Sequence, residues 1–110
     1  MRLRIDTSAI KFRVAGLAKP RDESRESKRQ KTTPDGRPIW TVRLNAIDGT
    51  AGSTETIWVE VAGPEPQLTL DEIAIVQGLV FSPWVNRKNE IVRSFRADSV
   101  ALEAATRRAA

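Results

Sequence analysis

The sequence predicts a single all-β domain, built as a five-stranded antiparallel barrel with a long basic first loop. Three observations predict this class: short runs in which apolar and polar residues alternate, turns rich in glycine and proline between them, and one charged tract near the N-terminus. Alternation with a period of two is typical of half-buried strands. A chain of 110 residues has room for one modest core. We assign residues 1–102 to the domain and residues 103–110 to a C-terminal tail.

The first strand is expected over residues 3–18, where Ile10, Phe12 and Val14 alternate with charged residues. The tract over residues 19–34 follows, with nine charged residues among its sixteen and none that is aliphatic or aromatic. Burial therefore cannot offset the entropy lost on ordering it. The tract is predicted to be a flexible basic loop.

Residues 39–48 and 54–62 are predicted to form the next two strands, because alternation is strongest there. Residues 48–53 (DGTAGS) read as their hairpin loop, since glycine and small residues cluster in it. In the strand over residues 54–62, Trp58 is on the face away from the aliphatic residues. In the strand over residues 39–48, Trp40 shares its face with aliphatic residues.

The remaining elements are less regular. Residues 68–75 favour one short helical turn, and residues 75–82 a strand that bends at Gly78. Residues 83–89 then predict a basic turn, and residues 91–102 a last strand. The tail beyond is rich in good helix formers and favours a helix.

Five strands in this order describe a small Greek-key barrel, of which the OB-fold is the commonest form. OB-folds bind oligonucleotides across their second and third strands. A sandwich of the immunoglobulin type is the structural alternative, although it usually has more strands.

Charge is distributed unevenly along the chain. Residues 1–43 carry 12 basic and 5 acidic side chains, residues 44–86 carry 6 acidic and none basic, and residues 87–110 carry 6 basic and 3 acidic. Together with a pI near 10.1, this clustering favours a polyanionic partner.

The chain has neither cysteine nor histidine. This excludes disulfides, thiolate chemistry, nearly all structural zinc sites and the commonest general base. We expect no enzymatic activity, no cofactor, no metal and no small-molecule substrate, although the composition alone leaves a carboxylate-metal nuclease open. With no long apolar run, the expected location is the cytoplasm and no membrane partner is expected.

Trp58 is the leading candidate for a base-stacking residue, because the alternation places its ring among polar neighbours. Packing under a loop or at a dimer contact is its alternative role. For Trp40 a core position is favoured. Trp84 either caps the barrel or faces a ligand. Phe95 either forms a stacking platform for bases or belongs to the core. The full set of predicted nucleic-acid-binding residues is Lys28, Arg29, Lys31, Arg37, Trp40, Arg43, Trp58, Trp84, Arg87, Lys88, Arg93 and Phe95.

Five segments carry a resemblance to a known family: MRLRI, DGRPIWTVRLN, ETIWVEV, LTLDEIAIVQGLVF and FRADSVALEA. Their order resembles the filamentous-phage single-stranded-DNA-binding protein and related small proteins of actinobacterial plasmids and integrative elements. The resemblance implies an OB-like barrel, a symmetric homodimer and sequence-independent coating of single-stranded DNA during replication or transfer. It places Gly36–Pro38, Ile39, Trp40 and Arg43 along the DNA groove. This chain departs from the family in having no tyrosine and a longer, more charged first loop.

The leading hypothesis is therefore a non-catalytic single-stranded-DNA-binding protein. A protein-interaction barrel of a replication or conjugation complex is the alternative, since aromatic residues are also enriched at protein interfaces. RNA binding through the same surface is a third possibility.

Overall fold

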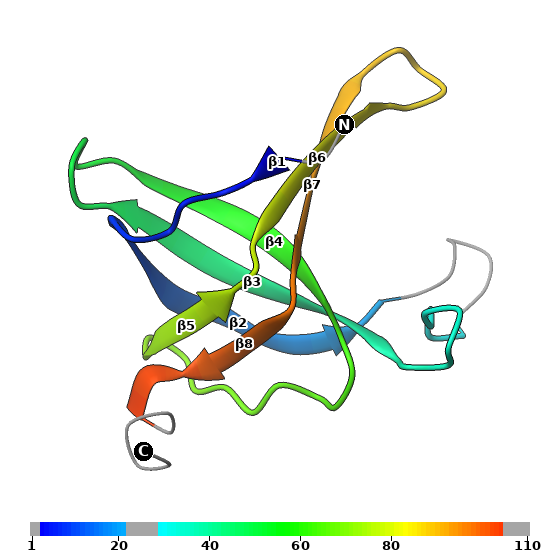
Figure 1. Cartoon of the computed structure of the whole chain (residues 1–110), viewed down its shortest axis with the longest axis horizontal. Helices are drawn as coiled ribbons and strands as arrows, with labels where there is room; N and C mark the ends of the chain where they lie inside the picture. The colour runs from blue at the N-terminus through cyan, green and yellow to red at the C-terminus, as the bar shows by residue number, and fades with distance from the viewer. Residues whose placement is uncertain (1–2, 22–28, 105–110) are drawn as a thin grey trace.

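The computed structural model describes residues 3–21 and 29–104, apart from the side chain of Trp84. These residues form eight strands that curl into one sheet, as Figure 1 shows. The strands are β1 (Leu3–Arg4), β2 (Ile10–Pro20), β3 (Ile39–Asp48), β4 (Thr54–Ala62), β5 (Ile73–Gln77), β6 (Val80–Val85), β7 (Ile91–Ala97) and β8 (Ser99–Leu102).

The all-β class is confirmed, but the predicted count of five antiparallel strands differs from the eight that the described residues form. The order across the sheet is β1-β6-β7-β4-β3-β2-β5-β8. Strands β2, β3 and β4 form an antiparallel meander. The sheet then curls because β5 pairs with β2 while β7 pairs with β4, and the β4–β7 pairing is parallel.

The two central strands, β3 and β4, begin and end at the predicted residues, and the predicted hairpin loop joins them. Asp48 shapes this loop, because its side chain accepts hydrogen bonds from the backbone N–H groups of Thr50 and Ala51, at 2.8 and 3.1 Å. Asx residues commonly fix turns in this way.

The core lies on the concave side of the curled sheet. Leu44, Val14, Val42 and Val59 are its largest fully buried side chains, and all belong to the meander. The alternation along β3 and β4 puts these residues inside and leaves every second side chain on the outer face.

Two predicted strands are each divided in the structure. Gly78 has a φ of +68° and separates β5 from β6, and Asp98 separates β7 from β8. The predicted bend is therefore at Gly78, but it interrupts the strand. The inner halves, β5 and β8, pair with each other, and so do the outer halves, β6 and β7. The result is one long hairpin folded across its middle.

The turn predicted at residues 83–89 lies later, at residues 86–90. Pro83 and Trp84 belong to β6, where the backbone of Trp84 pairs with that of Val92. The side chain of Asn86 accepts hydrogen bonds from the backbone N–H groups of Lys88 and Glu90, which closes the turn. Among the described residues, the pairing of β6 with β1 ends at Phe81, so the outer edge of β6 at Pro83 faces no described strand, and proline is found at such edges.

The helical turn predicted at residues 68–75 is wrong, because β5 already begins at Ile73. Asp71 has a φ of +67°, and its backbone N–H donates to the carbonyl of Val14. Because Asp71 pairs with β2 in this way, the chain forms a turn before β5 rather than a helical turn. Similarly, the first predicted strand is divided by residues 5–9. Within the described residues, no helix is long and apolar enough to cross a membrane.

Candidate nucleic-acid interface

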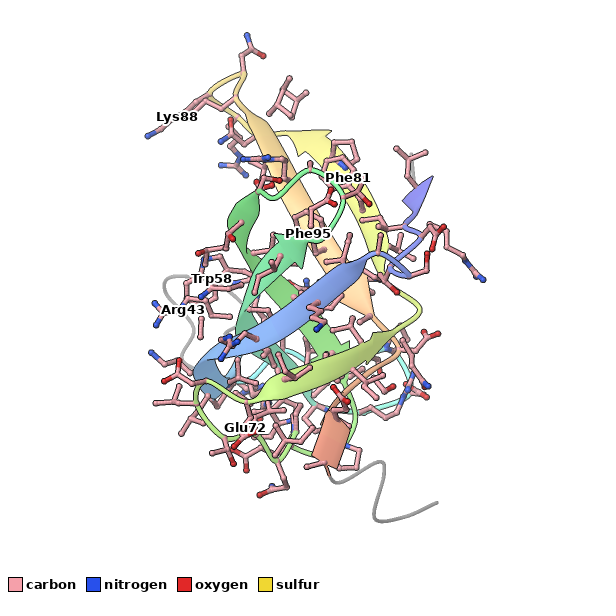
Figure 2. The ribbon with its side chains drawn as sticks, turned by 90° about the vertical axis from the view of Figure 1, so that its left-hand side faces the viewer. Arg43, Trp58, Glu72, Phe81, Lys88 and Phe95 are labelled. Atoms are coloured by element: carbon pink, nitrogen blue, oxygen red, sulfur yellow. The ribbon has the colours of Figure 1, made fainter. Side chains whose placement is uncertain are left out.

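The outer face of the meander carries a paired arginine and tryptophan. Arg43 on β3 and Trp58 on β4 are directly opposite each other, so their side chains point to the same face. The Arg43 guanidinium carbon lies 5.5 Å from the centroid of the Trp58 ring, which is a cation–π distance. Trp58 nevertheless remains 53% exposed, and Figure 2 shows the two side chains together on one flank of the molecule. The predicted outward position of Trp58 is confirmed.

Arg43 is held in this position from the neighbouring strand. Its guanidinium donates a hydrogen bond of 2.8 Å to the carbonyl of Ala15 on β2. Gly16 makes room for it, since a Cβ at Gly16 would lie 3.3 Å from Nε of Arg43. The cation is thus oriented before any ligand arrives.

A groove of about 650 Å³ opens beside Trp58. It lies where β7 separates from β4, because these strands pair only over Val59–Val61 and Phe95–Ala97. Four cations and two carboxylates line it, together with the Trp58 and Phe95 rings and hydroxyl groups from Ser82, Ser94 and Thr41. The charged residues are Arg21, Lys31, Arg93, Arg96, Glu60 and Asp98.

A second cavity of about 390 Å³ adjoins the groove and shares Lys31 with it. Its wall includes Arg37, which follows a tight turn at the end of the charged tract. The Thr33 hydroxyl and the Arg37 guanidinium both bond to the carboxylate of Asp35, and these contacts lower the pKa of Asp35 below its usual value. The turn therefore presents Arg37 beside the groove with its backbone fixed.

Glu60 on β4 forms the most protected ion pairs of the groove. One carboxylate oxygen lies 3.0 Å from Nε of Arg21, and the other lies 3.9 Å from a guanidinium nitrogen of Arg96. The Glu60 side chain is only 17% exposed. A single carboxylate of β4 therefore links Arg21, which follows β2, to Arg96 of β7.

The β6–β7 hairpin forms an arm that extends beyond the rest of the sheet (Figure 1). At its base the Phe81 and Phe95 rings pack together with their centroids 5.2 Å apart. Arg93 bonds across to Glu55 of β4 at 3.0 Å, with both side chains exposed. Lys88 lies at the tip, as Figure 2 shows.

The structure brings five of the predicted site residues to the groove or its adjoining cavity: Lys31, Arg37, Trp58, Arg93 and Phe95. Arg43 lies beside them. Phe95 packs partly against the core, and Arg93 lies at the rim. Trp40 takes another position: it is half-buried, and its indole N–H donates to the carbonyl of Gly63 at 3.0 Å.

The other predicted site residues lie elsewhere. Arg87 and Lys88 belong to the turn of the arm, and Arg29 is exposed outside the lining of both cavities. Lys28 and the side chain of Trp84 fall outside the described residues, as do residues 22–28 of the predicted loop and residues 105–110 of the predicted tail.

Four charged residues of the groove were absent from the predicted set: Arg21, Glu60, Arg96 and Asp98. Alternation alone places Glu60 on the same face as Trp58, so that signal was present in the sequence. Arg21 and Arg96 come from opposite ends of the chain, and only the curl of the sheet brings them to Glu60.

Among residues 3–21 and 29–104, no group of acidic residues is arranged to hold a metal ion. Comparisons of the chain with protein-family models, curated proteins and solved structures find no match. The proposed function therefore rests on the geometry of the groove.

Proposed function

We propose that the chain is a non-catalytic single-stranded-DNA-binding protein that holds the strand in the groove beside Trp58. The observation that carries this proposal is a half-exposed tryptophan ring bordering a groove lined by four cations. Cations that follow the phosphates, together with rings that stack on bases, are the usual means of binding single strands without sequence preference.

The fold proposal is an OB-like barrel. If β5 with β6, and β7 with β8, are each counted as one bent strand, the chain has five long strands. The first three then form the meander, and the remaining two form the hairpin that pairs with both of its edges. In OB-folds the second and third strands and the loops beside them bind oligonucleotides. Here those strands are β3 and β4, which carry Arg43 and Trp58.

The proposed binding mode combines base stacking with phosphate contacts. A base stacks on the Trp58 ring, which contributes on the order of 1–3 kcal/mol. Lys31, Arg37 and Arg93 contact phosphates, because they lie along the groove and its adjoining cavity. Among the described residues, the ion pairs of Arg37 and Arg93 are exposed ones, which are worth about 0–1 kcal/mol and exchange readily for phosphate contacts.

We expect a labelled oligothymidylate to bind with micromolar or tighter affinity at low salt and to be released as salt increases. Each neutralised phosphate contributes about −0.7 to the slope of log K against log salt, so about three contacts predict a slope near −2. Fluorescence anisotropy at several salt concentrations measures it. An affinity that is unchanged between about 50 and 200 mM salt would contradict an electrostatic groove.

A protein-interaction barrel is the second candidate function. It is favoured by Val85 and Ile91, which pair across the arm and are both largely exposed. Contiguous exposed apolar surface marks docking sites, whereas single exposed apolar residues are ordinary. The same titration separates the two functions, since this candidate predicts no salt-dependent binding of oligonucleotide.

Two further expectations extend the proposal: a homodimer, and a role in the replication or transfer of DNA in the cytoplasm. The identity of the bound strand, DNA or RNA, and the oligomeric state have direct tests. Parallel titrations with DNA and RNA strands compare the ligands, and sedimentation equilibrium measures the oligomeric state.

A further inference from the structure

Glu60 is an anion placed inside a groove that is otherwise suited to bind anions. It lies on the same face of β4 as Trp58, two residues further along the strand. Both of its oxygens face arginines, with Oε1 toward Arg21 and Oε2 toward Arg96. This arrangement matches the way in which a phosphate group would use two of its own oxygens.

The protection of Glu60 distinguishes it from the other carboxylates near the groove. Its side chain is 17% exposed, whereas Glu55 and Asp35 are at least 60% exposed in their pairs with Arg93 and Arg37. Less water around a charge pair means less screening, so the pairs of Glu60 are the harder ones to exchange. A carboxylate fixed on the same chain also acts at an effective concentration on the order of millimolar or higher.

We propose that Glu60 is an affinity-limiting residue, which withholds Arg21 and Arg96 from the phosphates of a bound strand. This inference rests on the proposed function, because it concerns the strength of binding in the same groove. Arg21 and Arg96 are thus occupied, whereas Lys31 has no ion pair among the described residues and Arg93 has only an exposed pair with Glu55. A limit on affinity lets a protein that coats DNA be removed from it.

The test compares Glu60→Gln with Asp98→Asn by anisotropy titration of a labelled oligothymidylate at several salt concentrations. Asp98 borders the same groove, and within the described residues no cation lies within ion-pair distance of it, so its variant removes the same charge without releasing an arginine. For Glu60→Gln we expect binding about three- to thirtyfold tighter and a slope steeper by about 1.4, because two cations become available. For Asp98→Asn we expect at most about a twofold gain and an unchanged slope.

A second variant keeps the test decisive if Glu60→Gln does not fold. Glu60→Asp retains the charge but draws the carboxylate back toward β4, so the longer contact with Arg96 is lost first. We expect its slope to be steeper by about 0.7, with a melting temperature close to that of the unmodified protein. A gain at constant net charge identifies the released arginine as its cause.

The outcomes separate the inference from the proposed function. If the unmodified protein does not bind the strand, the proposed function fails. If it binds, but the folded Glu60 variants bind no more tightly and with the same slope, the inference is overturned while the function stands. Equal slope changes for Glu60→Gln and Asp98→Asn would also overturn it, because they would reflect net charge alone.

Discussion

Trp58→Ala is expected to weaken oligonucleotide binding by about 1–3 kcal/mol, which corresponds to roughly 5- to 150-fold in affinity. The ring is 53% exposed beside the groove, so its removal takes away a stacking surface and leaves no internal cavity. Its contact with Arg43 is worth about 0.5–1 kcal/mol at an exposed site. The melting temperature should therefore fall by only a few degrees.

The measurement combines anisotropy titration with thermal unfolding of the same samples. Trp58→Phe is the matched variant, since a smaller ring should retain part of the binding energy. Trp40→Phe assigns the fluorescence signal, because Trp40 is half-buried and its N–H is bonded to Gly63. In a Trp84→Phe background, quenching by oligonucleotide should survive Trp40→Phe and disappear in Trp58→Ala. A large loss of stability in Trp58→Ala with unchanged affinity would refute the stacking role.

Gly78→Ala is expected to destabilise the fold by about 1.5–3.5 kcal/mol, which would lower the melting temperature by about 6–18 °C. Two costs combine at this position. The φ of +68° is strained for any residue with a Cβ, at about 1–2 kcal/mol. In addition, the new Cβ would overlap with the carboxylate of Asp98, whose exposed side chain must rotate away at a cost of about 0.5–1.5 kcal/mol.

Gly52→Ala is the matched control for this prediction. Gly52 has a nearly identical φ of +70°, but no atom lies within 4 Å of the place where its Cβ would be. Chemical denaturation of both variants should therefore show a smaller loss for Gly52→Ala. Adding Asp98→Ala to Gly78→Ala should recover the packing cost alone. Equal losses for the two glycine variants would contradict a role for Asp98.

The two central strands could be predicted to the residue because local information determines them. Alternation in β3 and β4 is regular, and the loop between them contains the aspartate and glycines that a hairpin needs. The same regularity placed Trp58 and Arg43 on the outer face. Period two is a property of neighbouring residues, so a single sequence suffices to read it.

The last part of the fold could not be predicted in the same way. The run from Ile75 to Ser82 is almost continuously apolar, and nothing local shows that its two halves pair with different strands. The division at Gly78 lies against Asp98, the residue between β7 and β8, which is 20 positions away in the sequence. Trp84 was assigned to a turn because of Pro83, but Pro83 lies within β6, at a position whose outer edge pairs with no described residue.

The candidate site was predictable only in outline. Basic residues clustered at both ends of the sequence indicated a polyanionic ligand, and Lys31, Arg37, Trp58 and Arg93 do border one continuous region. The role of Glu60 depends on its contacts with Arg21 and Arg96. The position of Glu60 in the sequence does not indicate these two partners. Ion pairs between distant strands follow from the way the sheet curls.

The closure of the sheet also determines when the groove can exist during folding. The meander joins β2, β3 and β4 through neighbouring segments, whereas β5 and β7 must reach its two edges from far along the chain. Contacts between distant segments cost more loop-closure entropy and form late. We therefore expect Trp58 and Arg43 to become neighbours early, and Arg93 and Arg96 to reach them only when the sheet closes. A chain arrested before that step would carry the ring without the cations of β7, so the binding groove is a property of the completed fold.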